Sequence, residues 1–104
     1  MKVNYSDLKY KRVFITGGGS GIGASIVEHF CEQGSEVYFI DIKVLEAKKL
    51  IEDIKNKKYS IPTFIECDLL NIKQLQKTIK DIIDQKGPIN ILINNASNLS
   101  LIHI

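Results

Sequence analysis

The sequence is poor in the features that mark several classes of protein. It has two cysteines, two prolines and no tryptophan, and no apolar run approaches the roughly 18 residues that a membrane-spanning helix needs. Polar residues dominate the first ten positions, so the apolar segment of a secretory signal peptide is missing there. We therefore expect a cytoplasmic protein without membrane contact.

Positive and negative charges nearly balance in this sequence. The 14 Lys and Arg residues exceed the 12 Asp and Glu residues by a formal net charge of +2, which is too small to indicate a nucleic-acid partner. A content of 44% hydrophobic and 25% charged residues is ordinary for a globular chain. The 104 residues have the length of one small domain, which can remove roughly two-thirds of its unfolded surface from water.

Neither cysteine belongs to a ligand motif. Cys31 and Cys67 stand alone in apolar patterns without C-x-x-C spacing, which favours two core residues over a metal or redox site. His29 falls in a helical pattern and is expected to face solvent. We therefore predict no metal site.

The clearest motif is the glycine-rich stretch TGGGSGIG at residues 16–23. It follows the apolar run 13–15 and precedes a helical pattern, an order typical of a phosphate-binding turn. Glycine lets the backbone adopt angles closed to other residues and lets an anion approach, while the following helix offers its unpaired N–H groups. We therefore expect the turn to bind a pyrophosphate. The residues predicted to take part are Thr16, Gly17, Gly19, Ser20, Gly21, Ile22 and Gly23.

The spacing of these glycines separates two kinds of nucleotide site. A P-loop of the ATPase type needs Lys-Ser or Lys-Thr after its last glycine, whereas Ala24 and Ser25 follow here. The common dinucleotide pattern G-x-G-x-x-G is also absent, because the glycines fall as Gly17-x-x-x-Gly21-x-Gly23. A flexible loop without a ligand is the alternative, and the agreement of strand, turn and helix patterns disfavours it.

Strand and helix patterns alternate along the chain. The predicted strands are 12–16, 36–41, 62–67 and 89–94, and the predicted helices are 21–33, 44–56 and 71–86. Such alternation requires a parallel sheet with right-handed crossovers, here an α/β doubly wound sheet of four strands in the order 3-2-1-4 with three helices. The predicted buried stripes are Ile22, Ile26, Val27 and Phe30 in the first helix and Ile72, Leu75, Ile79, Ile82 and Ile83 in the third.

An acidic residue ends the second predicted strand. Asp41 lies 20 residues after Gly21, the separation at which a carboxylate can bind the adenine ribose hydroxyls of a dinucleotide. It would repel the 2′-phosphate of NADP, and Ser20 offers no positive charge against that repulsion. NAD is therefore the predicted cofactor, and Lys43 keeps NADP as the less favoured alternative. A solvated strand end is the other interpretation of Asp41.

Together these motifs resemble the short-chain dehydrogenase/reductase family. The resemblance lies in the TG-x-x-x-G-x-G turn, Asp41, Asp68 and residues 94–97, NNAS, which stand where the family has NNAG. It implies a Rossmann-like fold in which Asp68 binds the adenine ring and the two asparagines brace the sheet. The further cofactor contacts that it implies are Ile42, Leu69, Asn94, Asn95, Ala96 and Ser97.

The resemblance extends from about residue 12 to residue 97 and covers the first half of the family's fold. We therefore expect one domain over residues 1–104, a truncated Rossmann-like sheet. The family transfers hydride between a nicotinamide and a carbonyl or alcohol, using a Tyr-x-x-x-Lys pair, a serine and an asparagine that follow this part of its fold. Tyr5 and Lys9 have the Tyr-x-x-x-Lys spacing but precede the first strand, so no catalytic residue is predicted.

Two interpretations of function follow. The chain is the NAD-binding portion of an oxidoreductase that is not competent alone, or it is a non-catalytic NAD(H)-binding module or truncated remnant. The apolar, uncharged segment 89–94 would form an edge of the sheet. Such an edge invites pairing with a second copy of the chain or with a complementary catalytic chain.

Overall fold

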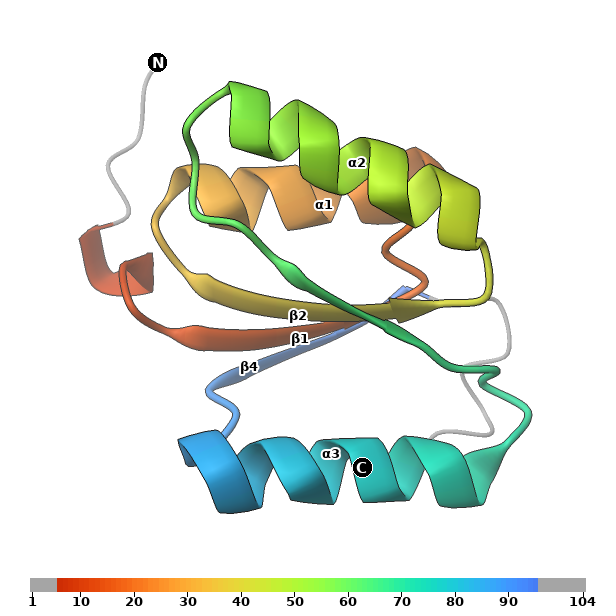
Figure 1. Ribbon diagram of the computed structural model, residues 1–104. Coiled ribbons are helices and arrows are strands. Elements are labelled where there is room, and N and C mark those ends of the chain that lie inside the picture. The colour runs from red at the N-terminus through yellow and green to blue at the C-terminus, as the bar shows by residue number, and fades with distance from the viewer. Residues whose placement is uncertain (1–5, 96–104) are drawn as a thin grey trace.

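The computed structural model describes residues 6–95 as a four-stranded parallel sheet with helices on both faces (Figure 1). The strand order is β3-β2-β1-β4 and every neighbouring pair is parallel, which confirms the predicted fold class. The elements are the 3-10 helix η1 (Ser6–Leu8), β1 (Arg12–Thr16), α1 (Gly21–Glu32), β2 (Glu36–Asp41), α2 (Val44–Asn56), β3 (Thr63–Glu66), α3 (Ile72–Lys86) and β4 (Ile91–Asn94).

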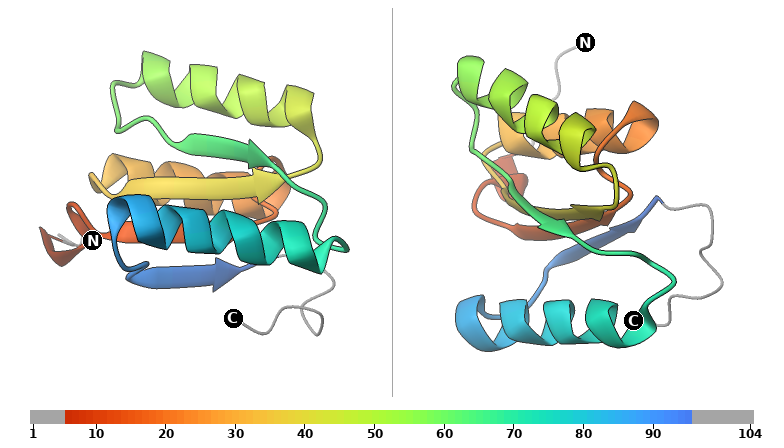
Figure 2. Two further views of the ribbon diagram at one scale, coloured as in Figure 1. Left: turned by 60° about the horizontal axis from the view of Figure 1, so that its bottom comes forward. Right: turned by 45° about the vertical axis from the view of Figure 1, so that its right-hand side comes forward.

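Helices α1 and α2 cover one face of the sheet, and α3 covers the other (Figures 1 and 2). Successive strand residues point to opposite faces, so Ile15 and Phe39 pack beneath α1 and α2 whereas Phe14 and Tyr38 pack against α3. Each fully buried Phe or Ile side chain stabilises the fold by roughly 1.5–3 kcal/mol. These two apolar layers are therefore the main source of stability, and both predicted core cysteines lie in them, Cys31 above the sheet and Cys67 below.

Strands β3 and β4 are shorter than the sequence predicts. β3 begins at Thr63, because Pro62 has no N–H to donate to a neighbouring strand. β4 begins at Ile91, because the pairing of Asn90 with Arg12 is only half that of a strand. The backbone N–H of Asn90 donates to the carbonyl of Arg12 at 2.9 Å, but the N–H of Arg12 donates to the side-chain oxygen of Asn90 at 2.7 Å. A side chain thus takes the place of a backbone carbonyl where the predicted strand should pair.

Helix α1 corrects one predicted core residue. Its fully buried stripe is Gly23, Val27 and Cys31, with spacings of four residues. Ile22, predicted to be buried, lies on the flank of this stripe in the first turn and is 75% exposed. The helical period is therefore right, but the buried face is rotated by one residue.

Asn71 and Gln74 have the spacing of a capping box, and helix α3 begins directly after Asn71. The side-chain oxygen of Asn71 accepts the backbone N–H of Gln74 at 3.1 Å, as a capping box requires. The Gln74 side chain donates to the carbonyl of Glu66 instead of returning to Asn71. Leu75, Ile79 and Ile82 are buried as predicted, whereas Ile83 is 44% exposed.

Arg12 ties together three segments at the amino edge of the sheet. Its Nε donates to the carboxylate of Glu36 at 2.7 Å, and its Nη1 donates to the carbonyl of Pro88 at 2.8 Å. The hydroxyl of Tyr38 donates to the same carboxylate at 2.9 Å. Partial burial acts to raise the pKa of Glu36, but the hydrogen bonds from Arg12 and Tyr38 outweigh it and lower that pKa.

We predict that Arg12→Met lowers the free energy of unfolding by about 1–2 kcal/mol, because it removes an ion pair and a bond to a backbone carbonyl that join β1 to two other segments. Lys77→Met is the matched control. It breaks an exposed pair with Asp81 within α3 and should cost about 0.5 kcal/mol or less. Urea unfolding followed by circular dichroism measures both, and equal losses would contradict the role given to Arg12.

The lowered pKa of Glu36 predicts a pH dependence. Stability from this carboxylate is present above its usual pKa of 4.5 and is lost as the pH falls through the lower folded value. The wild type should therefore be more stable than Glu36→Gln at neutral pH, and the difference should shrink below about pH 4. Urea unfolding at several pH values tests this, and a difference that stays constant down to about pH 2.5 would refute it.

Candidate functional site

The glycine turn follows the sheet before it rises into α1. The N–H groups of Gly17 and Gly18 both donate to the carbonyl of Ile40, at 2.9 and 3.3 Å, so the chain stays beside β2 after β1 has ended. Gly17 and Gly21 have φ angles of 68° and 60°, a region that favours glycine. The turn therefore begins and ends at residues with left-handed backbone angles.

Two further glycines are required by close packing. A Cβ at Gly23 would lie 1.9 Å from the carbonyl oxygen of Gly17, and one at Gly18 would lie 2.8 Å from the side chain of Phe39. At Gly21, by contrast, an added Cβ would meet no atom of residues 6–95 within 4 Å. The turn thus packs closely against the protein at Gly18 and Gly23, whereas Gly21 faces open space within residues 6–95.

The first turn of α1 lies beside this open space, and no side chain of residues 6–95 caps its backbone N–H groups. Ser20 caps the helix with extended backbone angles, and within residues 6–95 its side chain accepts no bond from the helix backbone. Its hydroxyl instead accepts from the Lys43 ammonium at 3.4 Å. First-turn N–H groups without a capping side chain are suited to an anionic ligand.

Asp41 is held by three backbone N–H groups. One carboxylate oxygen accepts from Gly19 in the turn at 2.8 Å, and the other accepts from Ile42 at 2.7 Å and Lys43 at 3.0 Å. The sequence predicted the position of this side chain but not these partners. Asp41 thereby links the end of β2 to the middle of the glycine turn.

Asp68 shapes the turn that follows β3. One of its carboxylate oxygens accepts the N–H of Leu70 at 2.9 Å, and its carbonyl accepts the N–H of Asn71 at 2.9 Å. The side chain itself is exposed. Asp68 is therefore a turn former that also offers carboxylate oxygens to the carboxyl edge of the sheet.

A cavity of about 210 Å³ brings the predicted residues together. Its walls are Gly17, Asp41, Ile42, Cys67, Asp68, Leu69 and Leu70. Sequence reasoning missed Cys67 and Leu70, although an apolar residue directly after Asp68-Leu69 could have indicated the latter. Burial, followed by the charge of Asp68, raises the pKa of the Cys67 thiol, which keeps it protonated as an apolar wall. Ile42 and Leu70 are 62% and 63% exposed and form an apolar rim.

Asn94 and Asn95 join the end of β4 to the glycine turn. The buried hydroxyl of Thr16 donates to the side-chain oxygen of Asn94 at 2.9 Å and accepts the N–H of Asn95 at 3.0 Å. The side-chain amide of Asn95 donates to the carbonyl of Gly17 at 3.1 Å. These asparagines therefore brace the turn and do not line the 210 Å³ cavity. Ala96 and Ser97 lie outside the described residues.

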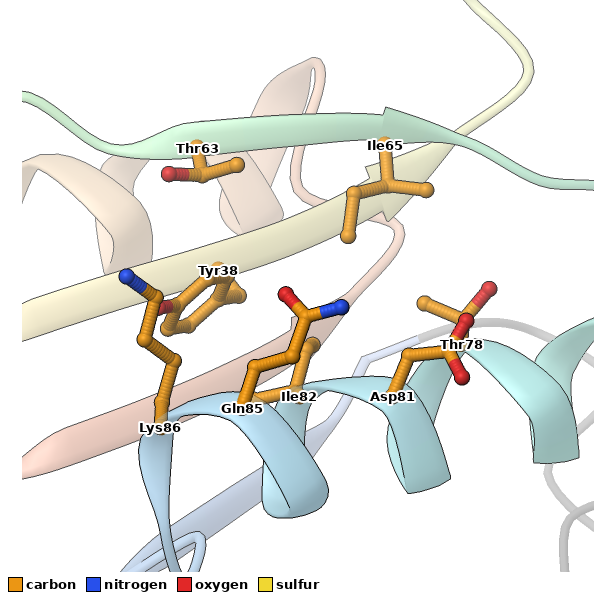
Figure 3. A pocket seen from close by; sticks show the side chains of 8 residues that line it. All are labelled: Tyr38, Thr63, Ile65, Thr78, Asp81, Ile82, Gln85 and Lys86. Atoms are coloured by element: carbon orange, nitrogen blue, oxygen red, sulfur yellow. The ribbon is translucent and has the colours of Figure 1, made fainter.

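Two other pockets lie apart from the cavity beside Asp41 and Asp68. Gly19 and Ser20 line one of about 210 Å³ between the glycine turn and α2. A larger one, of about 430 Å³, lies between β3 and α3, with Tyr38 at its base (Figure 3). The carboxylate on its rim, Asp81, is already paired with Lys77 at 2.8 Å. The acidic group that lines the larger pocket is therefore already engaged in an ion pair.

Other kinds of site find no support in residues 6–95. In this range no helix has the length and apolar character to cross a membrane. Nor do three or more His, Cys, Asp or Glu side chains of these residues gather as metal ligands would. The carboxyl edge is thus the best-formed candidate site in the described part of the chain.

Comparison with known proteins agrees with this geometry. The family model for short chain dehydrogenase matches residues 11–102. A Rhizobium meliloti (strain 1021) protein named probable galactose dehydrogenase GalD is 37% identical over 93 residues, which are 89% of this chain and 36% of the relative. D-xylose 1-dehydrogenase from Caulobacter vibrioides (strain NA1000 / CB15N) is 40% identical over 94 residues, 90% of this chain and 36% of the relative.

A solved structure has the same fold. The short-chain type dehydrogenase/reductase from Mycobacterium marinum superimposes with a TM-score of 0.72 at 24% identity, over 82% of this chain and 34% of that protein. The chain spans about a third of the length of the curated relatives it matches. It belongs to the short-chain dehydrogenase family, of whose fold it is the portion that binds the nicotinamide dinucleotide.

Proposed function

We propose that the carboxyl edge of the sheet binds NAD. The pyrophosphate lies at residues 16–23, the adenine ribose on Asp41, and the adenine ring in the cavity beside Ile42, Asp68 and Leu69. The observation that carries this proposal is that Gly17, Asp41 and Asp68 share one cavity although they come from three separate strand ends. Asn94 and Asn95 complete the set on the side of β4, and the predicted cofactor contacts of Ala96 and Ser97 belong to the same proposal.

Two features support NAD over NADP. The carboxylate of Asp41 lies where the ribose 2′-oxygen is expected, and it would repel a phosphate there. Ser20 offers a neutral hydroxyl in the turn, and the ammonium of Lys43 already contacts that hydroxyl. NADP binding is therefore weaker but not abolished.

We further propose that these 104 residues bind the cofactor without turning over substrate. The Tyr-x-x-x-Lys spacing occurs once, at Tyr5 and Lys9. Lys9 precedes the amino end of β1, whereas the glycine turn follows its carboxyl end, so Lys9 lies at the opposite edge of the sheet. The relatives whose names describe dehydrogenases are about two and a half times as long as this chain.

Titration with NADH, followed by nicotinamide fluorescence, tests cofactor binding. We expect saturable NADH binding, at least roughly tenfold weaker NADPH binding, and no binding by Gly21→Asp. The variant puts a carboxylate into the open space where the pyrophosphate is proposed to lie. Aspartate tolerates the left-handed backbone angles of this position better than most residues.

Ser25→Asp is the matched control, because it adds the same charge to an exposed position one turn further along α1. It should retain most NADH affinity. If the wild-type protein is folded, as checked by circular dichroism, and fails to bind NADH, the proposal is wrong. The interpretation as a truncated remnant is then favoured. NADH-dependent reduction of common carbonyls by the purified chain would refute the statement on turnover.

The free edge of β4 supports a proposal about partners. Within the described residues β4 pairs only with β1, and no charged residue occurs from Gly87 to Asn95. Leu92 on this strand and Ile83 on α3 are 38% and 44% exposed. We propose that this edge pairs with a second copy of the chain or with a complementary catalytic chain, as apolar edges without charge do.

Analytical ultracentrifugation tests this pairing. We expect the purified chain to self-associate with increasing concentration, and Leu92→Lys to weaken the association by roughly tenfold or more. Thr63→Lys puts the same charge on the opposite edge strand, β3, and should leave the association unchanged. A wild-type chain that stays monomeric at high concentration would count against pairing between copies.

A further inference from the structure

The middle of the glycine turn depends on one side chain. The start of the turn is anchored by the bonds of Gly17 and Gly18 to the carbonyl of Ile40, and its end is anchored by the first turn of α1. Between them, the N–H of Gly19 is buried and donates to the carboxylate of Asp41 at 2.8 Å. Gly19 is thus held from a strand end 22 residues further along the chain.

We propose that Asp41 is a positioning residue for the phosphate-binding turn and holds it in shape before any ligand arrives. This inference rests on the proposed binding of a dinucleotide at the turn. It gives Asp41 a second role, which is separate from contact with the ribose hydroxyls. The ribose-binding and pyrophosphate-binding parts of the site are then coupled through one carboxylate.

The physical reason is the freedom of the turn. Three consecutive glycines at positions 17–19 can adopt many backbone conformations, and a ligand that selects one of them loses affinity through the ordering. A buried N–H without an acceptor is also unfavourable, so the peptide of Gly19 would reorient if the carboxylate were removed. Asp41 prevents both effects by holding this N–H.

The contact leaves room for the ribose. An ionised carboxylate offers about four lone-pair directions, and three are used by Gly19, Ile42 and Lys43. The contact also requires glycine at position 19, because a Cβ there would lie 2.8 Å from the carboxylate oxygen. A methyl group at this position would therefore push Asp41 away while leaving its charge in place.

Amide hydrogen exchange of the unliganded protein, measured by NMR, tests the positioning role directly. In Asp41→Asn the exchange of the Gly19 amide should be at least roughly tenfold faster than in the wild type, because one amide oxygen cannot replace two carboxylate oxygens. Gly19→Ala should likewise accelerate exchange at Ile42 and Lys43. If Asp41→Asn does not fold, the exchange rates in Gly19→Ala decide whether Asp41 holds the turn. Asp84→Asn removes the same charge from the exposed face of α3 and should change none of these rates.

Binding of 2′,3′-dideoxy-ADP separates the two roles of Asp41. This probe has the adenine and the diphosphate but neither ribose hydroxyl. If Asp41 only binds the hydroxyls, Asp41→Asn and the wild type will bind it equally; if Asp41 positions the turn, the variant will bind it roughly tenfold more weakly. Asp84→Asn should bind like the wild type.

The outcomes distinguish this inference from the proposed function. The positioning role is overturned if amide exchange is unchanged at Gly19 in Asp41→Asn, or at Ile42 and Lys43 in Gly19→Ala. It is also overturned if the wild type and Asp41→Asn bind dideoxy-ADP with equal affinity. A wild type that binds neither ADP nor NADH refutes the proposed function, and the exchange rates still decide whether Asp41 holds the turn.

Discussion

The parallel pairing of β1 with β2 on one side and β4 on the other is the constraint on which the site depends. Parallel strands end at the same edge of a sheet, so the glycine turn, Asp41 and the Asn94-Asn95 pair are brought together although up to 79 residues separate them. The apolar side chains of β1, buried on both faces, hold this arrangement. The carboxyl edge is thus a consequence of how the core packs.

Hydrogen bonds between side chains and the backbone give this edge of the sheet a defined shape. Asn95, directly after β4, holds Thr16 and Gly17 at the start of the turn, and Asp41 holds its middle from the side of β2. Each such bond contributes only about 0.5–1.5 kcal/mol to stability. Their importance lies in shape, because they restrict a glycine-rich segment that has little stiffness of its own.

Much of this could be predicted from residues that act locally. Helix α2 has the predicted bounds, the cap at Asn71 forms, and the strand order 3-2-1-4 is confirmed, because helical spacing, capping and crossover handedness depend on short stretches of chain. The gathering of Gly17, Asp41 and Asp68 at one cavity follows from the same topology. The polar residues at the strand ends were found because they interrupt apolar runs.

By itself, then, the sequence determined the order of the elements, the position of the glycine turn in the chain and the identity of the side chains at the carboxyl edge. Only the tertiary structure decided that Ile22 is exposed, that the Asn90 side chain accepts the N–H of Arg12, and that Leu70 joins the cavity wall. It also decided which backbone groups Asp41 binds. The reason is physical: periodicity describes one element at a time, whereas burial and hydrogen-bond partners depend on which distant segment lies alongside.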